Sequence, residues 1–176
     1  MTLAVKDVAP KFELSDTSGT TWSNADGSAA LVTVVVFTCN HCPYALAWHE
    51  RIVDVARDYA DRGVRLLAIS SSDAEAYPRD SYEAMQERVA AEDWPMPYLY
   101  DGTQEVARAF GAKTTPDVFV LDAELRVRYR GAPDADYDDP SQNAAWLREA
   151  LDAVLAGDEP ARPETDPVGC SIKWKQ

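Results

Sequence analysis

The sequence predicts an α/β fold in which helices flank a mixed central sheet. The apolar run 31–37 precedes a segment with helical spacing of apolar positions, 43–59, and a second apolar run follows at 64–69. This strand–helix–strand unit implies two parallel strands joined by a right-handed crossover. Only a short break separates segments 118–121 and 125–129, which predicts an antiparallel hairpin. The sheet should therefore contain both kinds of pairing.

The other segments complete the plan of a single domain. They are a hairpin over 9–14 and 20–23, an inserted helix over 84–91 with a strand at 98–100, and helices over 104–110 and 144–155. We expect one domain over 1–176. Its parts would be an N-terminal hairpin extension (1–30), a core (31–157) and a C-terminal tail (158–176).

Composition and charge exclude several classes of function. The chain has 176 residues, 46% of them apolar, and a net charge of −13, so it can bury a core and should avoid nucleic acid and anionic membranes. No apolar stretch approaches the roughly 18 residues of a membrane helix. Residues 1–10 lack the basic start and apolar run of a secretory signal, which predicts a cytoplasmic protein. Three cysteines do not form a disulfide framework in that compartment.

Two cysteines, Cys39 and Cys42, directly follow the apolar run 31–37. A Cys-x-x-Cys motif beside a strand–helix–strand pattern is typical of a thioredoxin-like redox site. We expect Cys39 in the first turn of the following helix, where unpaired N–H groups and the helix dipole favour a thiolate. Cys39 would then attack the disulfide of a partner. Cys42, less accessible, would resolve the mixed disulfide.

The two residues between these cysteines, Asn40 and His41, also belong to the predicted site. A partly protonated His41 imidazole would stabilise a neighbouring thiolate and make the pair a better oxidant. A solvated loop histidine without influence is the alternative. We expect Asn40 to contact the substrate.

A structural metal site is the alternative interpretation of the cysteine pair. Zinc would need two more ligands, and only Cys170, His49 and His41 could supply nitrogen or sulfur. His49 is expected on the polar side of its helix, without a special role. We therefore expect no metal, and no cofactor beyond the redox-active Cys39–Cys42 disulfide.

The order of elements is similar to that of the thioredoxin fold, in its TlpA-type and peroxiredoxin-like (redoxin, AhpC/TSA-type) branch. The segments that carry this likeness are Ala9-Pro10-x-Phe12-x-Leu14-x-Asp16-x-x-Gly19 and Thr115-Pro116-Asp117-x-Phe119-Val120-x-Asp122. The segments around the dithiol (38–44) and at the C-terminus (169–175) resemble a group of small thioredoxin-family proteins whose physiological activity is not established.

The resemblance implies roles for two further residues. In the family the proline at the position of Pro116 is cis and packs against the dithiol, and the backbone at Thr115 is free to pair with an extended substrate. One departure limits the likeness. Thioredoxins carry a buried aspartate six residues before the first cysteine, and this chain has Thr33 there. Together with His41, this argues against a general reducing thioredoxin.

The third cysteine, Cys170, lies near the C-terminus. It is either a small apolar anchor of the tail or, if the tail folds back on the dithiol, an extra redox thiol. In the second case Lys173 and Lys175 would help if they lie close to it.

These observations predict a thiol–disulfide oxidoreductase. Its partners would be a disulfide-containing protein or a low-molecular-weight thiol, together with an electron-donating reductase. A thiol peroxidase is an alternative, but the peroxiredoxin motif Pro-x-x-x-Thr/Ser-x-x-Cys fits neither cysteine. The proline and hydroxyl positions hold Val35 and Cys39 when counted from Cys42, and Val32 and Val36 when counted from Cys39. A non-enzymatic metal-binding or docking module is the third possibility.

Overall fold

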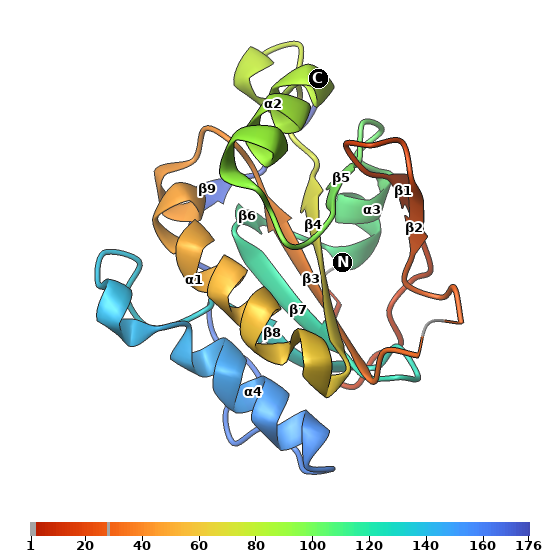
Figure 1. Cartoon of the computed structure of the whole chain (residues 1–176), viewed down its shortest axis with the longest axis vertical. Helices are drawn as coiled ribbons and strands as arrows, with labels where there is room; N and C mark the ends of the chain where they lie inside the picture. The colour runs from red at the N-terminus through yellow and green to blue at the C-terminus, as the bar shows by residue number, and fades with distance from the viewer. Residues whose placement is uncertain (1–2, 28) are drawn as a thin grey trace.

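A five-stranded sheet runs through the centre of the computed structural model, which describes residues 3–27 and 29–176 (Figure 1). Its strands lie in the order β5-β4-β3-β7-β8. They are β3 (Val32–Thr38), β4 (Val64–Ser70), β5 (Tyr98–Tyr100), β7 (Asp117–Leu121) and β8 (Val127–Gly131). Strands β3, β4 and β5 are parallel, whereas β7 is antiparallel to both β3 and β8. The predicted mixed sheet is confirmed.

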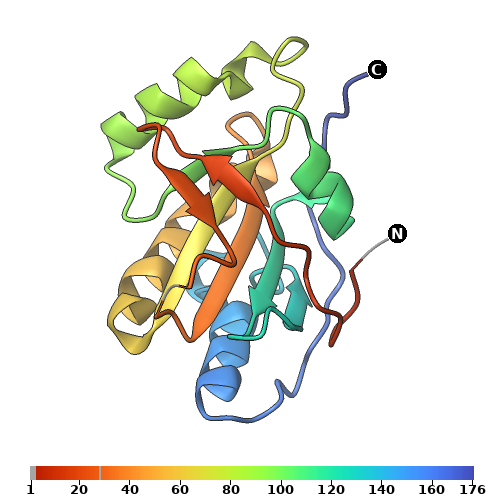
Figure 2. The ribbon, with the colours of Figure 1, turned by 90° about the vertical axis from the view of Figure 1, so that its right-hand side faces the viewer.

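Two apolar cores form because every residue of β3 is buried and successive side chains point to opposite faces. Val34 and Val36 face the core beneath α1 (Pro43–Tyr59) and α4 (Ala145–Leu155). Val35 and Phe37 face the other core, which α3 and the N-terminal hairpin cover (Figure 2). Helix α3 spans Glu105–Phe110, and the hairpin consists of β1 (Glu13–Ser15) and β2 (Thr21–Ser23).

Most elements lie where the sequence predicts them. The inserted helix α2 spans Tyr82–Glu92, and short 3₁₀ helices cover Ala60–Arg62, Pro78–Asp80 and Pro140–Gln142. Strand β8 begins two residues later than predicted, because Leu125 has a positive φ of 66° within the turn and the register shifts between Val120 and Leu121. Met1, Thr2 and Ser28 of the predicted N-terminal extension lie outside the described residues.

The sequence does not predict the pair formed by β6 (Thr114–Thr115) and β9 (Cys170–Ser171). These strands are antiparallel, and their register places Thr115 opposite Cys170. The C-terminal segment thus returns to the end of the sheet where β3 terminates.

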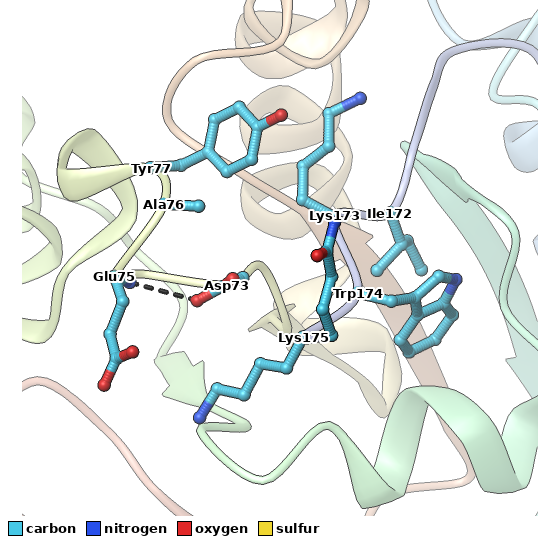
Figure 3. A pocket seen from close by; sticks show the side chains of 9 residues that line it. Asp73, Glu75, Ala76, Tyr77, Ile172, Lys173, Trp174 and Lys175 are labelled. Carbon is cyan, nitrogen blue, oxygen red and sulfur yellow. Dashed lines mark hydrogen bonds between the residues drawn. The ribbon is translucent and has the colours of Figure 1, made fainter.

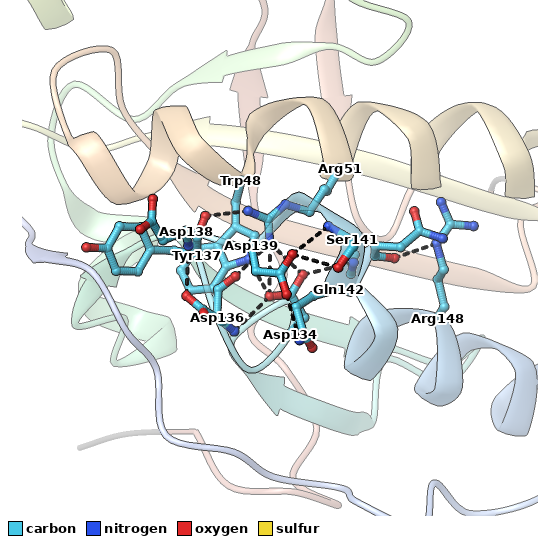
Figure 4. Close-up of polar contacts among 12 residues, drawn as sticks. Trp48, Arg51, Asp134, Asp136, Tyr137, Asp138, Asp139, Ser141, Gln142 and Arg148 are labelled. Atoms are coloured by element: carbon cyan, nitrogen blue, oxygen red, sulfur yellow. Dashed lines mark hydrogen bonds and ion pairs between the residues drawn. The ribbon is translucent and has the colours of Figure 1, made fainter.

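A buried polar network ties α1 to the loop before α4 (Figure 4). The Asp134 carboxylate accepts hydrogen bonds from Trp48 Nε1 (2.9 Å), Arg51 (2.8 and 3.0 Å) and the Ala144 N–H (2.9 Å). Both charged groups are almost completely buried, so each needs the other. In the described part of the chain, no helix has the length and apolar character to cross a lipid bilayer.

Candidate active site

The topology of the sheet brings Cys39 and Pro116 together. Strand β3 ends at Thr38, and the antiparallel β7 begins at Asp117, which lies opposite Phe37. Residues that follow β3 and residues that precede β7 therefore meet at the same end of the sheet. The Thr115–Pro116 peptide bond at this end is cis, as the sequence predicts.

Thr115 contacts both sulfurs of the pair. Its Oγ1 lies 3.4 Å from Cys39 Sγ, and its carbonyl oxygen lies 3.1 Å from Cys42 Sγ. Thr115 is itself buried, so these contacts are shielded from water. The hydroxyl can donate a hydrogen bond to a thiolate, whereas the carbonyl can only accept one from a thiol.

Helix α1 begins at Pro43, as the helical spacing of segment 43–59 predicts. Cys42 is the N-cap of α1, with extended backbone (ψ 123°), and Pro43 is the first helical residue. Proline suits that position because its fixed φ is helical and its missing N–H has no partner to lose. The prediction that Cys39 lies in the first turn is wrong. The unpaired N–H groups of the helix start are closest to Cys42.

The charge of the reduced pair follows this geometry. Cys39 and Cys42 are 1% and 0% exposed and hydrogen-bond to each other. That hydrogen bond and burial raise the pKa of Cys39. The hydrogen bond from Cys39, aided by Cys170 and Thr115 and opposed by burial, lowers the pKa of Cys42 to about 4. The Thr115 carbonyl favours a protonated Cys42. The side chains of Cys39, Cys170 and Thr115 have the opposite and larger effect on its pKa. These shifts favour the thiolate on Cys42, whereas the assignment of Cys39 as the attacking thiol stays a prediction.

Asn40 makes hydrogen bonds within the protein, whereas the sequence predicts that it contacts the substrate. Its N–H donates to Asp80 Oδ1 (2.7 Å), and its side-chain nitrogen donates to the Arg79 carbonyl (2.8 Å). Its side-chain oxygen accepts hydrogen bonds from Tyr98 and Arg88, both at 2.9 Å. Asn40 is buried and fixes the loop between the cysteines.

His41 is held by a carboxylate that the sequence does not reveal. Its Nδ1 is hydrogen-bonded to Asp80 Oδ2, and its ring stacks on Tyr77 with centroids 5.0 Å apart. Asp80 is completely buried and its negative charge contributes to raising the pKa of Cys39. Asp80 occurs in a Pro-Arg-Asp-Ser turn that resembles any solvated turn, so no local signal marks it.

Among the residues that the structure describes, one group could hold a metal ion, and it differs from the predicted set. Ligand atoms of Cys39, His41 and Asp80 lie within 4.8 Å of one another. His49 is not on a polar face: it is buried against Trp94, with ring centroids 4.5 Å apart. Burial lowers the pKa of His49 to about 4.

The backbone of Thr115 is not free, which corrects a further prediction. Cys170 occupies the position opposite Thr115 in the β6–β9 pair. Its side chain packs against the cluster of Cys39, Cys42 and Ala45. The edge expected to receive a substrate strand is therefore occupied by the protein's own tail.

Comparisons with known proteins give the family. The family model described as "AhpC/TSA family" matches residues 5–130. The chain belongs to the AhpC/TSA family. It is therefore a thiol-based redox protein of the redoxin type with a thioredoxin-like fold. No curated protein matches it.

Solved structures extend the likeness over almost the whole chain. A hypothetical protein from Sinorhizobium meliloti is 34% identical, with a TM-score of 0.93 over 99% of this chain and 97% of that one. An uncharacterized conserved protein from Geobacillus kaustophilus is 39% identical, with a TM-score of 0.91 over 98% and 93%. A putative thioredoxin from Neisseria meningitidis is 25% identical, with a TM-score of 0.68 over 88% and 93%. The likeness to the first two proteins thus extends over nearly the whole of this chain.

Proposed function

We propose that this AhpC/TSA-family protein is a thiol–disulfide oxidoreductase that uses the Cys39/Cys42 dithiol. Its substrate would be a disulfide-containing protein or a low-molecular-weight thiol, and a separate reductase would supply electrons. The catalytic set comprises the two cysteines, Thr115 and Pro116. His41 and its partner Asp80 adjust the charge beside Cys39.

One observation carries the proposal: two hydrogen-bonded thiols share a single residue, Thr115, that contacts both sulfurs. The hydroxyl of Thr115 favours a thiolate, and the helix start lies at Cys42. A thiolate at one sulfur and a proton at the other is the state from which disulfide exchange begins. One sulfur forms a mixed disulfide with the partner, and the other displaces the partner's thiolate.

A redox titration of the isolated pair tests this function. In a Cys170→Ser chain only Cys39 and Cys42 remain. We expect them to titrate as one two-electron couple in glutathione or dithiothreitol buffers, within the family's span of roughly −270 to −120 mV. Adding Cys39→Ser or Cys42→Ser to that chain should abolish the couple. A pair that never forms the Cys39–Cys42 disulfide contradicts the proposal.

A peroxidase would give a different result in the same samples. The match to the AhpC/TSA family model favours a peroxidase. The sequence does not, because neither cysteine has the peroxiredoxin spacing. Rapid consumption of hydrogen peroxide, with a sulfenic acid trapped on Cys39 or Cys42, would replace disulfide exchange by peroxide reduction as the function.

A metal-binding module is favoured by one specific observation, the proximity of Cys39, His41 and Asp80. A thiolate, an imidazole and a carboxylate are a ligand set that zinc accepts, with a fourth position for water or another residue. Metal analysis of protein purified under reducing conditions decides between the two functions. Stoichiometric zinc that blocks alkylation of Cys39 supports the metal site, and a metal-free, titratable dithiol supports the oxidoreductase.

A further inference from the structure

The C-terminal tail binds at the dithiol as a substrate strand would. Strand β9 adds to Thr114 and Thr115 in antiparallel register, with Cys170 opposite Thr115. Gly169 permits this approach, because a Cβ at this position would lie 2.2 Å from the Thr115 carbonyl oxygen. The tail backbone can approach Thr115 this closely because residue 169 has no side chain.

Several anchors beyond Cys170 hold the tail in place. Ile172 is buried in the core beside α3, and its N–H donates to the Lys113 carbonyl (3.1 Å). The Lys173 carbonyl accepts from the Asp73 N–H and from Gln104 Nε2, both at 2.8 Å. These contacts hold the tail in place beside the dithiol. An extended segment of a substrate protein would have to break them to take its position.

A groove of about 740 Å³ lies on the outer side of the tail, between loop 73–77 and residues 172–176 (Figure 3). Tyr77, which stacks on His41, lines the groove together with Lys173. The Lys173 ammonium lies 5.9 Å from the centre of the Tyr77 ring. The groove thus reaches from solvent to the residues that flank the dithiol and the tail cysteine.

Exposure separates the three cysteines. Cys39 and Cys42 are buried, whereas Cys170 is partly exposed. Cys170 also packs against the cluster that contains Cys39 and Cys42. Cys170 is therefore the cysteine of this site with solvent-exposed surface, which an external thiol can approach.

We infer that Cys170 is a third redox thiol of this site and that it connects the buried pair to external thiols through a Cys42–Cys170 disulfide. This inference rests on the proposed oxidoreductase function. The external partner is a low-molecular-weight thiol such as glutathione or an exposed cysteine of a protein.

The exchange is balanced at each step. In the first step the Cys170 thiolate attacks Cys42 Sγ of the Cys39–Cys42 disulfide. The Cys42–Cys170 bond forms and the Cys39–Cys42 bond breaks. Cys39 leaves as a thiolate and then takes a proton. An external thiolate then attacks Cys170 Sγ and expels Cys42 as a thiolate. A second external thiol releases Cys170. Two external thiols are oxidised to a disulfide, and the Cys39/Cys42 disulfide is reduced to two thiols. The reverse sequence reduces an external disulfide.

The acidity of Cys42 suits the second of these steps. Because the pKa of Cys42 is lowered to about 4, Cys42 is the better leaving group when Cys170 is attacked. Burial, followed by the hydrogen bond and charge of Cys42, raises the pKa of Cys170 to about 11. Oxidation of the pair removes the Cys42 charge and leaves the nearby Lys173, which acts to lower that pKa.

A cross-linking experiment on the full chain tests the contact. In Cys39→Ser, glutathione disulfide should convert Cys42 and Cys170 into an intramolecular disulfide. Intact mass would show the loss of two hydrogens, and a non-reducing digest would show the linked peptides. The matched control moves the thiol by one residue, as Cys39→Ser with Cys170→Ser and Ser171→Cys. Because neighbouring strand residues face opposite sides, the control should cross-link at least about tenfold less.

A rate measurement tests the connection. The Cys39–Cys42 disulfide of a Cys170→Ser chain should react with glutathione at least about tenfold more slowly than in the wild type, since the attack must reach a buried sulfur. Equal rates, equal cross-linking in the control, or a Cys170–glutathione adduct that Cys42 never resolves in the Cys39→Ser chain would overturn the inference. Absence of a Cys39–Cys42 disulfide in the Cys170→Ser chain would instead refute the oxidoreductase itself.

Discussion

Thr115 shows how one side chain can adjust the chemistry of two thiols. Its hydroxyl lies next to Cys39, and it lowers the pKa of both cysteines. Its carbonyl lies next to Cys42. The same residue thus offers a hydrogen-bond donor to one sulfur and an acceptor to the other. The side chain has no access to water, which makes the hydrogen bond stronger than one at the surface.

Replacing Thr115 by valine should therefore make the reduced pair less acidic. Thr115→Val keeps the β-branched shape and removes only the hydroxyl. We expect the midpoint of thiolate formation, followed by absorbance near 240 nm, to rise by about one pH unit. The pair should also become more reducing, because its thiolate form loses stabilisation.

The neighbouring threonine provides the control. The Thr114 hydroxyl donates to the Pro116 carbonyl and not to a sulfur, so Thr114→Val should leave the thiolate midpoint unchanged. A shift of equal size in both variants would mean that the strand, and not the Thr115 hydroxyl, determines the acidity.

At this scale the sequence predicted the chemistry but not its arrangement. Cys39, Cys42 and Pro116 are recognisable because few folds other than thioredoxin place two cysteines after a buried strand and a proline before a later one. Asp80 and the Thr115 hydroxyl are brought to the sulfurs by the fold, from positions 38 and 73 residues beyond Cys42. The predicted free backbone of Thr115 was wrong because the tail pairs with it. The internal hydrogen bonds of Asn40 depend on a loop that is distant in the sequence.

Helix α1 carries Cys42 at its start, and the Arg51–Asp134 network holds this helix against the rest of the protein. Arg51 also donates to the carbonyls of Asp136 and Tyr137, so one guanidinium orders a whole loop. Replacing one member leaves a buried charge without its partner, which costs more than the pair contributes in its intact form.

Asp134→Asn should accordingly destabilise the protein by roughly 3–5 kcal/mol. Urea unfolding, followed by tryptophan fluorescence, measures this change. The control is Glu159→Gln, which removes an exposed ion pair with Lys6 and should change the unfolding free energy by less than about 1 kcal/mol. If both variants unfold at the same urea concentration, the network does not hold α1.

The elements divide into those that the sequence predicts and those that it cannot. Strands β3 and β4 and helix α1 follow from periodicity, because each buries a continuous apolar face. Strand β9 has only two residues, Cys170 and Ser171, and nothing in its composition favours a strand. It forms because the anchored tail brings it to Thr115, which is a property of the tertiary structure alone.

Two buried titratable groups, on opposite faces of the central sheet, give the whole molecule opposing responses to pH. Burial raises the pKa of Asp117 to about 6 from its ordinary 3.8, against the attraction of Arg130. Burial lowers the pKa of His49 to about 4 from 6.5. Between about pH 4 and 6 the folded state binds more protons at Asp117 than the unfolded state, and fewer at His49. Stability from Asp117 is therefore lost as pH rises, and stability from His49 is lost as pH falls.

Each of the two groups changes the unfolding free energy by about 3 kcal/mol across this window, so in the wild type they nearly cancel. Asp117→Asn should uncover the His49 contribution, and its unfolding free energy relative to wild type should rise from pH 4 to pH 6. His49→Gln should do the reverse. Urea titrations at several pH values measure both slopes, and the double variant should again match the wild-type slope. A single variant whose slope equals that of the wild type would show that its residue does not titrate in this range, and the compensation between the two faces would then not exist.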